Sequence, residues 1–184
     1  MEIIGFCGVI GSGKDYKCNE YIQNGYTRIA FADQLRELCY ATVGWKQSDS
    51  LYYELFKDTY WNPIYKKINP FNGRDLLERL GKHLMIMFGD DIWVKLLDKK
   101  IEIENIQKVV ISDVRYKEEI KYILSKNGKI FFCNYKSLRY EIRKTEPEKL
   151  ARLLIAKGFK DGDDVTEFLT EFIKDGENNA PKNE

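Results

Sequence analysis

The chain has 184 residues, which is enough for one domain with a substantial core and too few for two typical domains. Its 30 Lys and Arg residues nearly balance 29 Asp and Glu residues, so no global positive charge favours nucleic-acid binding. No stretch approaches the ~20 apolar residues of a membrane span, and the first residues do not resemble a signal peptide. The cysteines, Cys7, Cys18, Cys39 and Cys133, lack metal-type spacing. We therefore expect reduced, buried thiols in a single cytoplasmic domain over residues 1–174 that binds neither nucleic acid nor membranes.

The first feature of the chain is an apolar run that passes into a glycine-rich turn. The run is short enough for a buried strand, and residues 8–15 then read Gly-Val-Ile-Gly-Ser-Gly-Lys-Asp before a helical pattern begins. This order is typical of a phosphate-binding P-loop. Glycines let the backbone N–H groups point inward, the helix N-terminus adds partial positive charge, and Lys14 can reach the β- and γ-phosphates. The predicted phosphate-binding residues are Gly8, Gly11, Ser12, Gly13, Lys14, Asp15 and Tyr16.

Asp15 departs from the usual P-loop pattern, in which Ser or Thr offers a hydroxyl group to Mg²⁺. A carboxylate can also hold the metal, directly or through water, but it repels phosphates unless its charge is balanced. The alternative is a glycine-rich turn that binds nothing. The combined match of strand, loop and helix favours the phosphate site.

Hydrophobic periodicity and turn residues predict alternating strands and helices along the chain. Besides the first strand, we expect strands over 26–32, 109–115 and 129–134. The expected helices cover 13–24, 33–43, 74–88, 92–104, 118–124, 147–157 and 165–174. This order predicts an α/β fold with a mainly parallel sheet flanked by helices. Residues 175–184 are polar and are expected to form a disordered tail.

The run from Val109 to Arg115 is apolar and β-branched, and it ends in an acid followed closely by a base. Such a run is typical of a central parallel strand that is buried on both faces. Ligands in these folds bind at the carboxyl ends of the strands. We therefore expect Asp113 to lie near Lys14, the alternative being an ordinary acid at a strand end.

Two segments of the chain each allow two interpretations. Residues 45–72 are rich in aromatic side chains and contain Pro63 and Pro70. They form either an insertion that closes over a planar base or a satellite core without a ligand. Residues 135–145 are basic, and Arg139 and Arg143 belong either to a mobile lid over a transferred phosphoryl group or to a solvated charged face.

Several of these blocks together resemble one family, the deoxynucleoside monophosphate kinases of bacteriophages and related viruses. The blocks are Gly8 to Asp15 with its Gly-Lys-Asp ending, Phe31 to Arg36, Arg74 to Gly81 followed by Trp93, and Ser112 to Arg115 followed by Glu119. They cover residues 1–135 in the order found in the family. Their joint occurrence is more specific than the P-loop alone.

The resemblance implies a three-layer P-loop kinase fold and an enzyme that uses ATP and Mg²⁺ to convert a deoxynucleoside 5′-monophosphate to the diphosphate. It implies Lys14, Asp15 and Arg115 as catalytic residues, and Asp15 and Asp113 as metal ligands. The implied acceptor-site residues are Arg36, Arg74, Gly81, Lys82, Trp93, Asp113, Arg115 and Glu119. The implied partners are small-molecule nucleotides, a homodimer is a candidate assembly because dimers are common in the family, and a viral protein would act in the host cytoplasm.

The chain also departs from the family pattern. Tyr16 and Lys82 stand where family members commonly have Thr, Ile86 stands where they often have Arg, and the part after residue 135 lacks a clear fifth strand. Either the acceptor site is rearranged, with Lys82 supplying charge, or the activity is weak or absent. Two alternative functions follow. One is a P-loop kinase for another phosphorylated metabolite, because dephospho-coenzyme A kinases and animal phosphomevalonate kinases resemble parts of the pattern. The other is a nucleotide-binding protein with a decayed kinase site.

Overall fold

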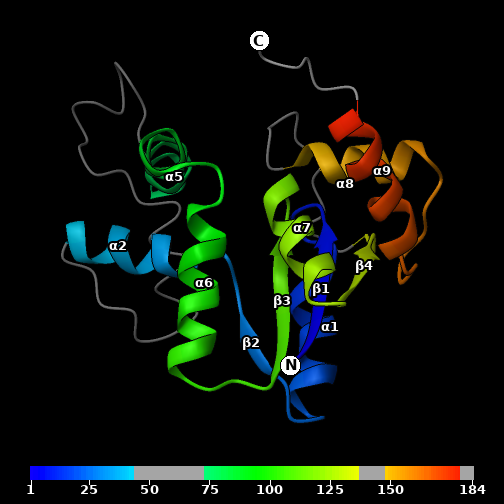
Figure 1. The fold of residues 1–184 in the computed structure, drawn as a ribbon, viewed down its shortest axis with the longest axis horizontal. Coiled ribbons are helices and arrows are strands. Elements are labelled where there is room, and N and C mark those ends of the chain that lie inside the picture. Colours follow the sequence, from blue (N-terminus) through cyan, green and yellow to red (C-terminus); the bar gives the residue numbers. More distant parts are fainter. Residues whose placement is uncertain (44–72, 137–147, 179–184) are drawn as a thin grey trace. The chain divides into compact units, whose positions relative to one another are not determined.

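The computed structural model describes residues 1–43, 73–136 and 148–178 (Figure 1). The aromatic segment 45–72 and the candidate lid residues Arg139 and Arg143 lie outside these ranges. The chain divides into two compact units. The first contains Met1–Phe31 and Val94–Glu184, and the second contains Ala32–Trp93.

The first unit is built on a parallel sheet. Its strands are β1 (Glu2–Gly8), β2 (Thr27–Ile29), β3 (Lys108–Val114) and β4 (Lys129–Cys133). Among the described residues they form a four-stranded sheet in the order β2-β3-β1-β4, and every neighbouring pair is parallel. In register, Ile3 lies opposite Val109 and Gly5 lies opposite Ile130. The apolar runs of β1 and β3 therefore occupy the centre, as expected for strands buried on both faces.

Helices cover both faces of the sheet in this unit. They are α1 (Lys14–Ile22), most of α6 (Ile92–Ile103), α7 (Lys117–Ser125), α8 (Lys149–Ala156) and α9 (Thr166–Asn178). Phe6 of β1 packs in one cluster with Cys18 of α1. A Cβ atom on the neighbouring Gly5 would instead lie 2.7 Å from Ile123 of α7. Because successive residues of a strand face opposite sides, α1 and α7 cover opposite faces. The predicted α/β class with a parallel sheet and flanking helices is confirmed.

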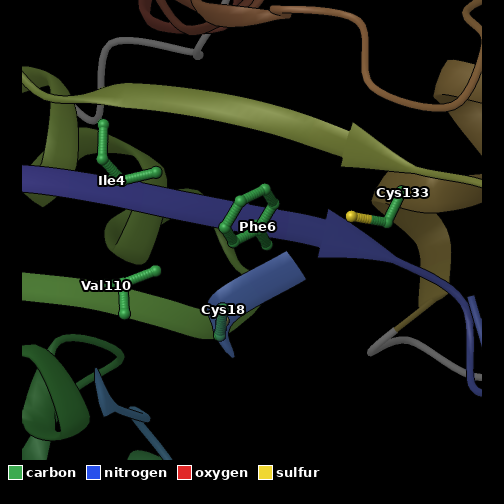
Figure 2. Packing of buried hydrophobic residues seen from close by; sticks show 5 residues of the cluster. All are labelled: Ile4, Phe6, Cys18, Val110 and Cys133. Carbon is green, nitrogen blue, oxygen red and sulfur yellow. The ribbon is translucent and has the colours of Figure 1, made fainter. Parts of the chain in front are cut away.

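A hydrophobic cluster joins β1, β3, β4 and α1. Figure 2 shows its buried members, Ile4, Phe6, Cys18, Val110 and Cys133. Burial raises the pKa of the Cys18 and Cys133 thiols to about 12 each, so both stay uncharged near neutral pH. All four cysteines are buried free thiols, which confirms the expected burial.

The segment before α9 lies along the outer edge of β4. The Gly162 N–H donates to the Phe132 carbonyl at 2.7 Å, and the Phe132 N–H donates to the Asp163 carbonyl at 2.9 Å. Phe131 and Asp164 form an isolated antiparallel bridge. The sequence after residue 135 showed no clear fifth strand. The structure has a short antiparallel segment at this edge of the sheet. Helix α9 extends to Asn178, so residues 175–178 of the expected tail are helical.

The second unit contains the helices α2 (Asp33–Val43) and α5 (Gly73–Phe88), which contact each other. A Cβ atom on Gly81 of α5 would lie only 2.9 Å from Cδ2 of Leu35 on α2. The glycine therefore allows the two helices to approach closely. In the part of the chain that the structure describes, no helix combines the length and the apolar character needed to cross a membrane.

Helix α6 offers a matched test of the core, because it carries a fully buried leucine next to an exposed one. Leu97 is 0% exposed, whereas Leu96 is 38% exposed. We expect Leu97→Ala to lower the free energy of unfolding by about 2–5 kcal/mol, and Leu96→Ala by less than about 1 kcal/mol. Urea unfolding of both variants measures the difference. Equal losses would contradict this placement of the core.

Candidate functional site

The site begins where β1 ends and the chain turns into α1. Gly8 has φ +148°, and a Cβ atom there would lie 2.2 Å from the Cys133 carbonyl oxygen of β4 and 2.6 Å from Oγ of Ser12. Gly13, which precedes α1, has φ +83°. A side chain at Gly8 would clash with these atoms. At Gly13 the left-handed backbone conformation is strained for any residue other than glycine. The predicted glycine loop therefore forms a tight turn at the carboxyl edge of the sheet.

Lys14 folds back against this loop. Its Nζ donates to the carbonyl oxygens of Gly8 at 2.9 Å and Val9 at 2.5 Å, and to Oγ of the buried Ser12 at 3.3 Å. Burial, followed by the charge of Arg115, lowers the pKa of Lys14 below its ordinary value. The loop carbonyls compensate the buried ammonium group. The same group can exchange these contacts for the oxygens of a bound anion.

Asp15 in the first turn of α1 has a cationic neighbour. Nη2 of Arg28 on β2 lies 3.3 Å from Oδ1 of Asp15 and donates to Oγ of Ser112 at 2.9 Å. The carboxylate of Asp15 is 82% exposed, so it remains accessible. Arg28 balances the negative charge that makes Asp15 an unusual residue beside a phosphate site.

The position of Asp15 fits a magnesium ion that is shared with phosphate. Mg²⁺ in phosphoryl-transfer sites is held by one or two carboxylates together with phosphate oxygens and water. Among the described residues, no group of three or more His, Cys, Asp or Glu side chains could hold a metal by itself.

Two buried carboxyl groups organise the end of β3. Oδ1 of Asp113 accepts the Phe31 N–H at 2.9 Å. Oε2 of Glu119 accepts the N–H groups of Arg115 at 2.6 Å and Tyr116 at 2.9 Å, which caps α7. Burial and the charge of Asp113 raise the pKa of Glu119 to about 8, although the two N–H bonds and Arg115 oppose the shift. Through these hydrogen bonds the two acids hold in place the backbone around Arg115.

The bond from Phe31 to Asp113 also explains a difference from the predicted strand. The sequence predicts a strand over 26–32, whereas β2 covers only Thr27–Ile29. The Phe31 N–H binds a side-chain carboxylate of β3, and the chain turns into α2 soon afterwards. The strand is therefore shorter than its β-forming composition indicates.

The expected site residues fall into two groups. Lys14, Asp15, Asp113, Arg115 and Glu119 belong to the first unit and lie at the ends of β1 and β3 or at the helices that follow. Arg36, Arg74, Gly81, Lys82 and Trp93 belong to the second unit. In the first group, the charge of Arg115 acts on both Lys14 and Glu119, whereas the cavity lining contains Lys14 and Asp15 but not the other three. An acceptor role for the second group stays a prediction.

Within the second unit, the expected acceptor residues have packing partners of their own. Nη1 of Arg36 donates to Oδ1 of Asp33 at 2.7 Å, and both side chains are largely buried. Trp93 is buried, and its Cζ2 would lie 4.0 Å from a Cβ atom on Gly81. Lys82 is exposed, and Arg74 is half-buried.

A cavity of about 630 Å³ opens beside the glycine loop. Its lining residues are Gly11, Ser12, Gly13, Lys14, Asp15, Tyr16, Lys17, Tyr135 and Asp161. Most of the predicted phosphate-binding residues thus line one space. Its size lies in the range of about 300–1,000 Å³ that is typical of pockets for small ligands.

Sequence reasoning missed several residues of the site. Arg28 lies in a strand, and Tyr135 and Asp161 lie in connections without a motif. Glu148, just before α8, is also missed, and its Oε1 accepts the Ile10 N–H of the loop at 3.2 Å. The order of the strands brings these residues to the loop. The only sequence signal was a charged residue, Arg28, inside an otherwise β-forming run.

Glu119 predicts a pH dependence of stability. Because its pKa in the folded protein is about 8, above the ordinary value of a carboxyl group, unfolding releases its proton between these two values. The stability that Glu119 contributes is therefore complete below its ordinary pKa and is lost as the pH rises toward 8. We expect Glu119→Gln to reduce the loss in the free energy of unfolding that accompanies rising pH in this window.

Urea unfolding of the wild type and of Glu119→Gln at several pH values between 5 and 8 measures this pH dependence. Glu118→Gln is the matched control, because Glu118 also lies in the first turn of α7 but its side chain is 34% exposed and pairs with Lys121. If both variants changed the pH dependence equally, burial of Glu119 would not be its cause.

Comparison with protein-family models and with curated protein sequences finds no match to this chain.

Proposed function

We propose that this protein is an ATP-dependent kinase that phosphorylates a deoxynucleoside 5′-monophosphate, with the fold of a three-layer P-loop kinase. The observation that carries the proposal is the glycine loop between the central strand β1 and helix α1. It encloses the ammonium group of Lys14 and borders a cavity of nucleotide size. A glycine loop followed by a helix N-terminus is suited to phosphate groups.

The chemistry of phosphoryl transfer fits the residues at this edge of the sheet. Transfer between two nucleotides needs positioning and charge compensation rather than covalent help from the protein. Lys14 would hold the phosphates of ATP, and the nearby Arg115 would add positive charge where negative charge develops. Magnesium, held by Asp15 together with phosphate oxygens, would neutralise further charge. The acceptor phosphate is already an anionic nucleophile, so no general base is required.

The acceptor class rests on the family resemblance in the second unit. Arg36 and Arg74 carry the forked guanidinium group that suits the 5′-phosphate of a nucleotide. Trp93 would contribute to the acceptor site through its position after helix α5. The sequence predicted that Asp113 binds the metal and the acceptor. In this proposal Asp113 instead positions the backbone of Phe31, because its carboxylate accepts the Phe31 N–H.

Lys14→Ala should abolish nearly all turnover while leaving the fold intact. Within the part of the chain that the structure describes, the Lys14 ammonium group donates its hydrogen bonds to the loop, and it would supply positive charge to the transferred phosphoryl group. We expect a loss of about 100-fold or more in kcat. ADP formation from ATP and Mg²⁺, assayed with each of the four deoxynucleoside monophosphates, measures it.

Lys99→Ala is the matched control, because it removes an exposed lysine that pairs with Glu102 on α6. Turnover that depends on the acceptor and requires Lys14 supports the kinase. Wild-type rates in Lys14→Ala would refute the P-loop assignment. ATP binding without turnover on any acceptor nucleotide would instead favour another phosphorylated acceptor or a decayed site.

Arg28→Gln should weaken ATP binding by leaving the Asp15 carboxylate unbalanced beside the triphosphate. Because the pair is solvent-exposed, we expect a loss of only about threefold to fivefold in affinity. In an Asp15→Ser background, the same Arg28→Gln change should have little effect, since no carboxylate remains to be balanced. A double-mutant cycle of ATP dissociation constants measures this coupling. Equal effects of Arg28→Gln in both backgrounds would contradict the proposed charge balance.

A further inference from the structure

The cavity beside the glycine loop extends beyond the residues that a triphosphate needs. Its lining also contains Tyr135, two residues after β4, and Asp161, in the connection between α8 and α9. A Cβ atom on Gly13 would lie 3.7 Å from Cβ of Tyr135, so this tyrosine stands directly beside the loop. These residues and the loop therefore border one continuous space.

Asp161 is held firmly in this lining. Its Oδ1 accepts the Asn134 N–H at 2.7 Å, and the next residue, Gly162, donates to the Phe132 carbonyl at 2.7 Å. These bonds tie the connection to the end of β4. Within residues 1–43, 73–136 and 148–178, Oδ2 of Asp161 accepts no hydrogen bond. The Asp161 carboxylate, a residue of the cavity lining, can therefore accept a further hydrogen bond.

A negative charge at this place is unfavourable for phosphate and favourable for a hydrogen-bond donor. Lys14 and Lys17 line the same cavity near the start of α1, so we expect phosphate groups to bind at that end. The part of a ligand that lies against Asp161 should therefore present N–H groups. Tyr16 and Tyr135 are 69% and 64% exposed, so neither ring is needed for the core, and exposed aromatic faces can stack on a planar base.

On the basis of the proposed kinase function, we propose that Tyr16, Tyr135 and Asp161 form the subsite for the base of the phosphate donor, and that Asp161 selects adenine by accepting its 6-amino group. Oδ1 accepts the Asn134 N–H, so a donor from the base would meet the carboxylate mainly at Oδ2. The 6-amino group of adenine is a hydrogen-bond donor, whereas guanine and hypoxanthine carry a carbonyl oxygen at this position. A 6-oxo base, as in ITP, would place a carbonyl oxygen against the carboxylate and would be disfavoured.

The test compares the dissociation constants of ATP, GTP and ITP by calorimetry for the wild type and for Asp161→Asn. We expect the wild type to bind ATP about tenfold more tightly than ITP, the size expected for one hydrogen bond to a charged group. In Asp161→Asn, Oδ1 can still accept the Asn134 N–H, but an amide NH₂ now faces the base. ATP binding should weaken and ITP binding should strengthen, so that the preference disappears or reverses.

Two controls separate this inference from the proposed function. Asp163→Asn removes a charge from the same connection, but the Asp163 carboxylate accepts the Lys160 N–H, so the preference for ATP should persist. Lys14→Ala should weaken ATP and ITP equally, because it acts on the phosphates that both share. An unchanged ATP to ITP ratio in Asp161→Asn, or tighter wild-type binding of GTP than of ATP, overturns the adenine subsite while leaving the kinase proposal intact. Failure of the wild type to bind any nucleotide overturns both.

Discussion

The structure depends first on how closely the end of β1 approaches the end of β4. At Gly8 the two backbones are so near that a Cβ atom would lie 2.2 Å from the Cys133 carbonyl oxygen. This approach forces the chain away from the sheet and into the glycine loop. It also places Tyr135, two residues after Cys133, beside Gly13. One steric constraint thus positions both the loop and the nearest wall of the cavity.

Electrostatic compensation is local, which agrees with a formal net charge of only +1. The buried ammonium group of Lys14 is compensated by loop carbonyls rather than by a carboxylate. This difference matters because carbonyl dipoles are weaker partners than an anion. A bound phosphate can therefore compete for Lys14, whereas a salt-bridged lysine would have to break a stronger contact first. Arg28 and Asp15 pair with each other instead, outside the loop.

The parts of the fold that were predictable from the sequence are those encoded by neighbouring residues. The apolar run of β1, the glycines and Lys14 form one local pattern, and the β-branched run of β3 requires burial on both faces. The limits of β2 were not predictable, because the Phe31 N–H binds the carboxylate of Asp113, far away in the sequence. For the same reason, the contact between Arg28 and Asp15 was not predictable from the sequence. These contacts depend on the order of the strands, which periodicity does not specify.

The C-terminal part of the chain contributed no motif, yet it contacts the site at two points. Glu148 accepts the Ile10 N–H of the loop, and the connection that carries Asp161 is bonded along β4. Glu148 is buried, and its carboxylate on a loop N–H restrains the backbone at that point. In the proposed function, phosphate binding would therefore depend on the N-terminal motif. Discrimination between ligands would depend on the edge of the sheet where the C-terminal segments are bonded along β4.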